Sequence, residues 1–215
     1  MAAREGAVNA KCAGLGQLRD LLITTPEPLR GELRPLTQAR LLRRLAATRP
    51  GTRRDPELRG SMLALRSIAR RVLELTAEER ALGREIEALT RKLAPQLLEQ
   101  PGVGPHAAAQ LVLSWSHQGR IRSEAAFARL AGVAPLPASS GQTIRHRLSR
   151  SGDRQLNRAL HTVILHRRQH DPTTRDYIAR RVAQGKSSRD ATRILKRYLA
   201  RHLYRVMQNA SPAMT

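Results

Sequence analysis

The sequence predicts an all-α protein in which a helical hairpin or coiled-coil arm precedes a compact helix–hairpin–helix-like domain. Three observations support this fold class. Apolar residues recur at helical spacing over most of the chain, no alternating strand pattern of useful length occurs, and turn signals divide residues 101–215 into short amphipathic segments. We expect the arm over residues 1–95, the compact domain over 96–209 and a disordered tail over 210–215. One short hairpin, around Pro135–Leu148, is the expected exception.

Two helices are expected before residue 50. The first carries apolar residues at helical spacing: Val8, Cys12, Leu15, Leu18 and Leu22. It should end at Thr24–Pro28, because proline fixes φ and removes a backbone donor. A second helix is expected over 29–47, and a loop follows at 49–52.

The clearest periodicity follows in a third, longer helix. Its apolar residues alternate steps of three and four: Leu65, Ile68, Val72, Leu75, Leu82, Ile86, Leu89 and Leu93. Glu79 occupies the one missing position of this heptad seam, and Pro95 weakens or ends the helix. The helix either packs on its neighbours in the same chain or forms a coiled-coil arm. We favour the arm, which would join copies of the chain into a homo-oligomer, because the stripe is narrow and sustained.

The spacing of apolar residues and turn signals predicts five shorter helices in the second half of the chain. They are expected at 105–116, 124–131, 153–168, 172–184 and 188–208. Asp171 and Pro172 form an N-cap followed by proline at the first helical position, and Gly185 ends that helix.

The charge of the chain points to a polyanionic partner. Lys and Arg total 39 against 17 acids, a net charge of +22. Residues 1–100 hold 19 basic and 12 acidic residues, whereas 101–215 hold 20 and 5, so nucleic-acid phosphates are expected on the second half. The composition alone is shared with ribosomal and other RNA-binding proteins, so it indicates a class of partner only.

The remaining composition excludes several classes of protein. No long apolar run, signal peptide or lipidation motif occurs, so we predict no membrane association. Cys12 is the single cysteine, which excludes an internal disulfide and a cysteine-based zinc finger and suits a reducing cytoplasm. We expect Cys12 to be a small buried residue. His161, His166 and His170 lack a cysteine or acid that would complete a zinc site, so no metal ligand is predicted in this chain.

A glycine-rich segment predicts contact with a phosphate. Gly102 and Gly104 flank a small apolar residue immediately before an alanine-rich helix start. Glycine permits close backbone approach, and the amides at a helix N-terminus can bind a phosphate oxygen without reading base sequence. The alternative is a plain tight turn between two helices.

A serine beside glycine predicts a candidate nucleophile. Ser139, Ser140 and Gly141 lie in a loop that also contains prolines, and arginines follow it: Arg145, Arg147, Arg150 and Arg154. A hydroxyl can attack a phosphodiester while guanidinium groups hold the phosphate. By composition alone, Ser-Ser-Gly is ordinary loop chemistry.

The order of these motifs resembles one family. Pro101–Pro105, Phe127–Pro135, Ser140-Gly141 and Leu148–Leu160 together are similar to the C-terminal domain of the insertion-sequence one-ten family of transposases, which includes the pilin-gene invertase. The resemblance runs from about Pro101 to Met207. The helices before it are similar to the linking coiled coil of the family.

The resemblance implies DNA recombination in transposition. Family members cut and rejoin DNA with a serine of this domain, and with magnesium held by four carboxylates of a preceding RuvC-like domain. Some are guided by a structured RNA. Carried to this chain, the serine is Ser140, with Ser139 the adjacent alternative. The nucleic-acid contacts that we predict are Gly102, Gly104, Arg145, Arg147, Arg150, Arg154 and Arg158.

The chain departs from the family in one respect. No RuvC-like first strand with its aspartate is found, and the early acids lie on arginine-rich segments. We therefore expect the chain to begin after the metal-binding domain, and magnesium to belong only to that domain. The alternative function is a DNA- or RNA-binding fragment that does not cut.

Overall fold

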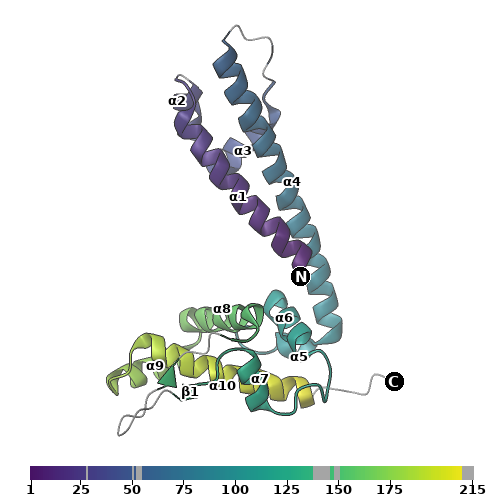
Figure 1. The fold of residues 1–215 in the computed structure, drawn as a ribbon, viewed down its shortest axis with the longest axis vertical. Coiled ribbons are helices and arrows are strands. Elements are labelled where there is room, and N and C mark those ends of the chain that lie inside the picture. The colour runs from purple at the N-terminus through teal and green to yellow at the C-terminus, as the bar shows by residue number, and fades with distance from the viewer. Residues whose placement is uncertain (28, 50, 52–54, 138–145, 148–150, 210–215) are drawn as a thin grey trace. The chain divides into compact units, whose positions relative to one another are not determined.

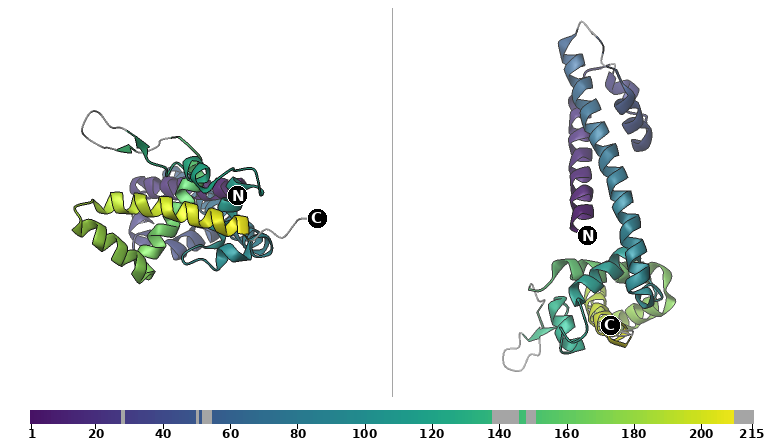
Figure 2. Two further views of the ribbon diagram at one scale, coloured as in Figure 1. Left: turned by 90° about the horizontal axis from the view of Figure 1, so that it is seen from below. Right: turned by 90° about the vertical axis from the view of Figure 1, so that its right-hand side faces the viewer.

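The computed structural model describes residues 1–27, 29–49, 51, 55–137, 146–147 and 151–209 (Figures 1 and 2). The expected tail at 210–215 lies outside these residues. The described part contains ten helices and one two-stranded hairpin, which confirms the all-α prediction. Two compact units, Met1–Glu85 and Ile86–Thr215, divide the chain, and each is described by itself below. The predicted boundary at 95/96 lies farther along the chain.

The first unit contains α1 (Ala2–Thr24), α2 (Leu29–Leu33), α3 (Gln38–Ala47) and most of α4 (Pro56–Leu93). Its core is aliphatic and consists of Leu18, Leu33, Leu41, Leu42, Leu45, Leu65, Ala69 and Val72. At Gly14, an added Cβ would lie 2.8 Å from Cγ2 of Val72. Glycine at this position therefore lets α1 pack close against α4.

Two predictions for the first unit are wrong in detail. The single helix expected over 29–47 is two helices, α2 and α3, because Pro35 lies between them and proline cannot continue a helix. Cys12 is exposed, since the face of α1 that packs inward carries Ala7, Gly14 and Leu18. The end of the first helix before Pro26 is confirmed.

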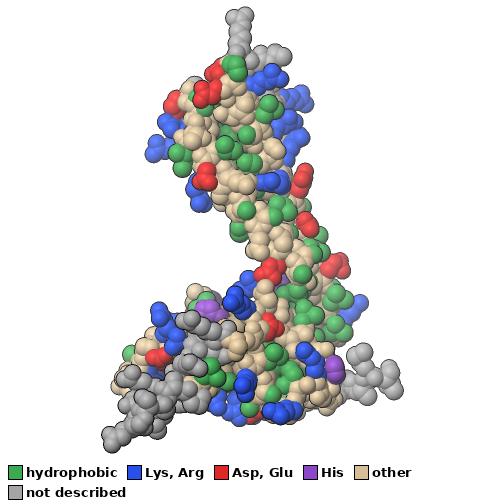
Figure 3. Space-filling view, in the orientation of Figure 1, with side chains coloured by type: hydrophobic (Ala, Val, Ile, Leu, Met, Phe, Trp, Pro, Cys, Tyr) green, Lys and Arg blue, Asp and Glu red, His purple; other side chains and the backbone are tan. Residues whose placement is uncertain are grey.

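The heptad seam of α4 has two different environments. Its first members, Leu65, Ile68 and Val72, belong to or pack on the core of the first unit. Toward the end of the helix, Leu89 is 56% exposed and Leu93 is 67% exposed. Figure 3 shows hydrophobic side chains on the surface of this part of α4. Packing within the chain therefore accounts for the first members of the seam and leaves its last two members, Leu89 and Leu93, exposed.

Glu79 interrupts the seam for a reason that the structure shows. Its carboxylate accepts a hydrogen bond from Nη2 of Arg4 at 3.1 Å and pairs with the Lys11 ammonium, both on α1. The hydrogen bond from Lys11 is the main reason why the pKa of Glu79 lies below its ordinary value. A leucine here would leave two cations of α1 without their acid.

The second unit contains α5 (Pro95–Leu98), α6 (Pro105–Trp115), α7 (Glu124–Leu130), α8 (Arg154–His170), α9 (Pro172–Ala183) and α10 (Ser188–Asn209). These bounds confirm the predicted helices of the second half. Its core includes the fully buried Leu111, Phe127, Leu160, Ile164 and Leu203. The longest helix of this unit, α10, packs against α7, α8 and α9. The Phe127 and Tyr204 rings, 5.7 Å apart, join α7 to α10.

The predicted end signals and hairpin are present. Asp171 accepts hydrogen bonds from the backbone N–H groups of Thr173 and Thr174, so it caps α9 as expected. Gly185 has φ +83° just after that helix. Strand β1 (Leu136–Pro137) pairs antiparallel with β2 (His146–Arg147), inside the range predicted for a hairpin. Among the described helices, none has the length and hydropathy needed to cross a lipid bilayer.

Candidate nucleic-acid interface

A glycine–aspartate pair holds the start of α8 in place. Gly152 has φ +108°, and a Cβ there would lie 2.4 Å from the carbonyl oxygen of Leu130. The N–H of Asp153 donates to that same carbonyl at 2.7 Å. Only glycine fits so close an approach with a positive φ, so α8 begins at a fixed place beside α7.

Asp153 then uses both carboxylate oxygens. Oδ1 accepts from the N–H groups of Gln155 and Leu156, which caps α8. Oδ2 accepts from the Ser114 hydroxyl of α6 at 2.5 Å. The Ser-Gly-Asp segment of the predicted arginine-rich motif thus positions the helix that carries Arg154 and Arg158.

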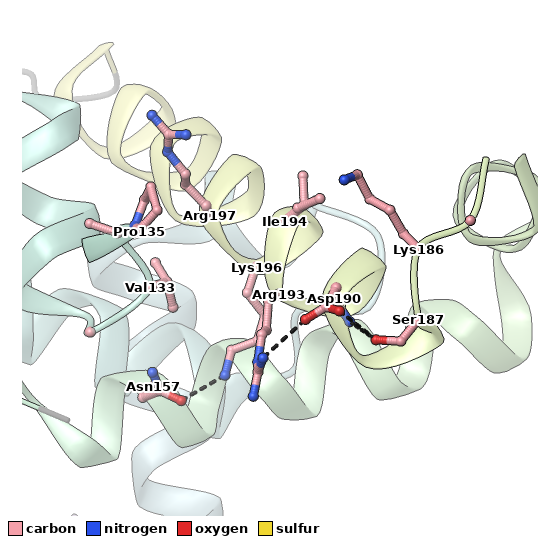
Figure 4. A pocket seen from close by; sticks show the side chains of 13 residues that line it. Val133, Pro135, Asn157, Lys186, Ser187, Asp190, Arg193, Ile194, Lys196 and Arg197 are labelled. Carbon is pink, nitrogen blue, oxygen red and sulfur yellow. Dashed lines mark hydrogen bonds and ion pairs between the residues drawn. The ribbon is translucent and has the colours of Figure 1, made fainter. Parts of the chain in front are cut away.

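Two open pockets lie along α10 and share three lining residues, Asn157, Arg193 and Lys196. The first, of about 600 Å³, is lined mainly by residues 132–135, by the loop 185–187 and by α10 (Figure 4). The second, of about 450 Å³, is lined by residues 151–154, by α8 and by α10. The first turns of α8 and α10 therefore face the same recess.

The linings of both pockets are rich in cations. Their basic side chains are Arg154, Arg158, Lys186, Arg189, Arg193, Lys196 and Arg197. The acidic side chains among the lining residues are Asp153 and Asp190. Asp153 is engaged as a helix cap, and Asp190 accepts from the Ser187 hydroxyl at 2.6 Å and pairs with Arg193 at 3.0 Å. The bond from Ser187 is the main reason why the pKa of Asp190 is lowered. The recess therefore keeps a net positive charge.

Lys196 is half-buried and is held by a neutral side chain. Its Nζ donates to Oδ1 of Asn157 at 2.6 Å, and Nδ2 of Asn157 donates to the carbonyl of Ala131 at 2.7 Å. Burial lowers the pKa of Lys196, and the neighbouring Arg193 adds to the effect. The pKa of His161, in the second pocket, is lowered by partial burial and then by the charges of Lys196 and Arg168.

The structure brings together two of the predicted contacts. Arg154 and Arg158 are exposed on one side of α8 and line the second pocket. Arg147 lies in β2, where only its backbone is described. The candidate nucleophile Ser140 and its alternative Ser139 lie outside the described residues, as do Arg145 and Arg150.

The two glycines of the predicted helix–hairpin–helix loop lie just before α6, and only Gly102 contacts α8, near its C-terminal end. A Cβ on Gly102, which has φ +74°, would lie 3.0 Å from Cγ of Arg167, whose Nε donates to the carbonyl of Pro101 at 2.6 Å. This contact is roughly 20 Å along the helix from Arg154, at 1.5 Å per residue. Gly104 is the N-cap residue of α6 and faces open space. The close packing against Arg167 thus explains why residue 102 is glycine. Phosphate binding by Gly102 or Gly104 stays a prediction.

Sequence reasoning missed Lys196 and Asn157. A signal for Lys196 was present, since it lies on the face of α10 that carries the buried Thr192, Leu199 and Leu203. A lysine at an inward position of an amphipathic helix needs an explanation. Among the described residues, no group of three or more histidines, cysteines or acids could hold a metal ion.

Comparison with known proteins gives a family to part of this unit. Residues 94–179 match the family model described as Transposase IS116/IS110/IS902 family. A curated relative, the "Insertion element IS110 uncharacterized 43.6 kDa protein" of Streptomyces coelicolor (strain ATCC BAA-471 / A3(2) / M145), is 32% identical over 148 residues. This match covers 67% of the chain and 36% of the relative's length. The family match runs from α5 into α9, and it ends before α10. The chain contains a domain of the Transposase IS116/IS110/IS902 family.

Proposed function

We propose that this chain is the DNA-binding part of a transposase that acts in DNA transposition. The observation that supports this most is the basic recess between α8 and α10, half of which belongs to the matched transposase domain. Its cations converge from two helices, and its two acids are already engaged. Such a surface binds sugar-phosphate chains through charge and releases their counterions, without reading bases directly.

Ser140 is the nucleophile in this proposal, with Ser139 the alternative. Pro135, which lines the first pocket, and β1 precede Ser140 in the sequence. The serine oxygen would bond to phosphorus, the sugar oxygen would leave with the proton, and rejoining would reverse these steps with another strand. Arg145, Arg147 and Arg150 would hold the same phosphate. This proposal derives from the family resemblance and the order of the motifs along the chain.

DNA binding and cleavage by Ser140 can be tested separately. The purified chain is mixed with DNA that contains the element ends, in the presence of magnesium. Binding that weakens steeply with salt is expected for the wild type. Ser140→Ala should bind equally well and form no covalent protein–DNA product. If both proteins bind and neither cuts, this chain by itself is a binding module, as expected for a part that lacks the metal-binding domain.

The arginines of α8 make the binding proposal quantitative. Each phosphate contact contributes about 0.9 to the slope of log K against log salt. Arg154→Ala with Arg158→Ala should therefore make the slope shallower by about 2. Arg40→Ala with Arg43→Ala, exposed on α3, is the matched control and should change it little. An unchanged slope in the α8 variant would refute its role in binding.

We also propose that copies of the chain associate through the second half of the α4 seam. Leu89 and Leu93 are exposed there, on a helix whose first half is already covered within the chain.

A structured guide RNA, which the resemblance implies for some members, is the second polynucleotide to test as a partner.

A further inference from the structure

Lys196 is a half-buried cation with no acid beside it among the described residues. It lies on the inward face of α10, between Thr192 and Leu199, which are 7% and 4% exposed. No carboxylate of the described residues pairs with it, and its one acceptor is the neutral Oδ1 of Asn157. An ammonium group has three donors, so two remain for whatever enters the pockets.

Asn157 holds this ammonium without neutralising it. Its Nδ2 is engaged by the carbonyl of Ala131, which turns Oδ1 toward Lys196 (Figure 4). Both residues line both pockets. An unneutralised charge that is partly removed from water is costly, and an anion in the recess would offset that cost.

The surroundings indicate which anion fits. Arg193 contributes to both pockets, while Arg158 and Arg189 contribute to the second. Burial lowers the pKa of Lys196 and of His161, and a neighbouring cation adds to each effect, Arg193 at Lys196 and Lys196 at His161. Both pockets are far larger than one phosphate group, and Lys196 lies where they meet. A polyanion that runs through both would therefore place a charged group at Lys196.

We propose that Lys196, held by Asn157, anchors one backbone phosphate of a bound polynucleotide strand at the junction of the two pockets. The proposal rests on the proposed DNA binding and adds the residue that fixes the position of the strand on the protein. It lies on α10, outside the segment that matches the family model. Phosphodiesters of DNA and of RNA share the required chemistry, and the test separates them.

Acylation of lysine side chains, followed by mass spectrometry of the full chain, tests the anchor directly. The chain has only four lysines, and exposed Lys92 on α4 is the internal reference. A phosphate at Lys196 should raise its pKa by one unit or more, so its labelling should slow by about tenfold or more relative to Lys92. Labelling is measured with duplex DNA, with an RNA hairpin and with inorganic phosphate, each added separately at the same total concentration of phosphate groups.

Protection by duplex DNA, with little by inorganic phosphate, is the expected result. Equal protection by inorganic phosphate would overturn a polynucleotide anchor in favour of a small-anion site. Protection by the RNA hairpin alone would support the anchor and overturn DNA as its ligand.

Two isosteric variants on α8 provide the second test. Asn157→Asp places an acid on Lys196 and also removes the hydrogen bond to the carbonyl of Ala131, so its helix content and unfolding are measured first. In the folded variant DNA affinity should fall by about tenfold, the effect of losing one charged contact of about 1.4 kcal/mol. Gln169→Glu, exposed at the other end of α8, adds the same charge away from the pockets and is the control. Equal losses in the two variants would overturn the anchor.

The outcomes also separate the anchor from the proposed function. If the wild type binds DNA while Lys196 labels at an unchanged rate, the anchor is wrong and DNA binding stands. If the wild type ignores DNA at low salt, both are wrong. Lys196→Met tests the same contact, and the labelling and Asn157→Asp results decide the question if that variant fails to fold.

Discussion

Replacing Gly152 by alanine should destabilise the second unit far more than the same change at Gly185. Both glycines have positive φ, +108° and +83°, so alanine is strained at either position. They differ in their surroundings. An added Cβ on Gly152 would meet the carbonyl oxygen of Leu130 at 2.4 Å, whereas one on Gly185 would meet nothing within 4 Å.

The magnitude follows from the bonds that must give way. A positive φ costs alanine about 1–2 kcal/mol. Relief of the overlap at Gly152 requires the 2.7 Å bond from the N–H of Asp153 to Leu130 to open, which costs about 1 kcal/mol. Displacement of Asp153 also weakens the cap of α8, for about 1 kcal/mol more. We therefore expect losses of about 3–4 kcal/mol for Gly152→Ala and about 1–2 kcal/mol for Gly185→Ala.

Urea unfolding followed by the fluorescence of Trp115 measures this loss. Trp115 is the only tryptophan and packs against the core of the second unit, so it reports on that unit alone. Equal free energies of unfolding for the two variants would refute the argument that Gly152 is required by the close approach of Leu130.

Three further changes test other parts of the structure. Glu79→Gln removes the ion pairs with Arg4 and Lys11 and should cost about 1 kcal/mol at pH 7. Because the pKa of Glu79 is lowered from 4.5, this stability is present above pH 4.5 and is lost as the pH falls through the folded value. Urea unfolding of variant and wild type should therefore converge as the pH falls well below 4.5, and a pH-independent difference would contradict the prediction. Gly102 has φ +74°, and an added Cβ would lie 3.0 Å from Cγ of Arg167, so Gly102→Ala should lower the free energy of unfolding by about 1–2 kcal/mol. The salt slope of DNA binding should stay unchanged. A shallower slope would favour a phosphate contact at this glycine. Leu89→Glu with Leu93→Glu should shift the sedimentation of the chain toward the monomer without loss of helix content, because both side chains are exposed. Ala77→Glu, exposed on the same helix but off the seam, is the control. Identical sedimentation of the wild type, the double variant and the control would contradict association through α4.

The local features of the fold could be predicted closely because neighbouring residues encode them. The periodicity of α4, the Asp171 cap and the ends of α6 to α10 all depend on residues within one or two helical turns. The error at 29–47 had a local signal too, since Pro35 is visible in the sequence.

The candidate site could be predicted only in part. Arg154 and Arg158 follow a recognisable Ser-Gly-Asp motif on their own helix, and the structure places both at one pocket. Lys196 joins them from a helix more than thirty residues later, through Asn157. Nothing in the sequence pairs those two residues, because the contact depends on how α10 packs on α8.

By itself, the sequence determined the all-α class, the excess of positive charge in the second half and the motifs that resemble a transposase domain. Only the tertiary structure decided that half of the heptad seam is covered within the chain and that Gly102 packs against Arg167. It also decided that a lysine without an acid lies where two basic pockets meet. The physical reason is that helix formation depends on residues close in sequence, whereas burial and charge pairing depend on which distant surfaces pack together.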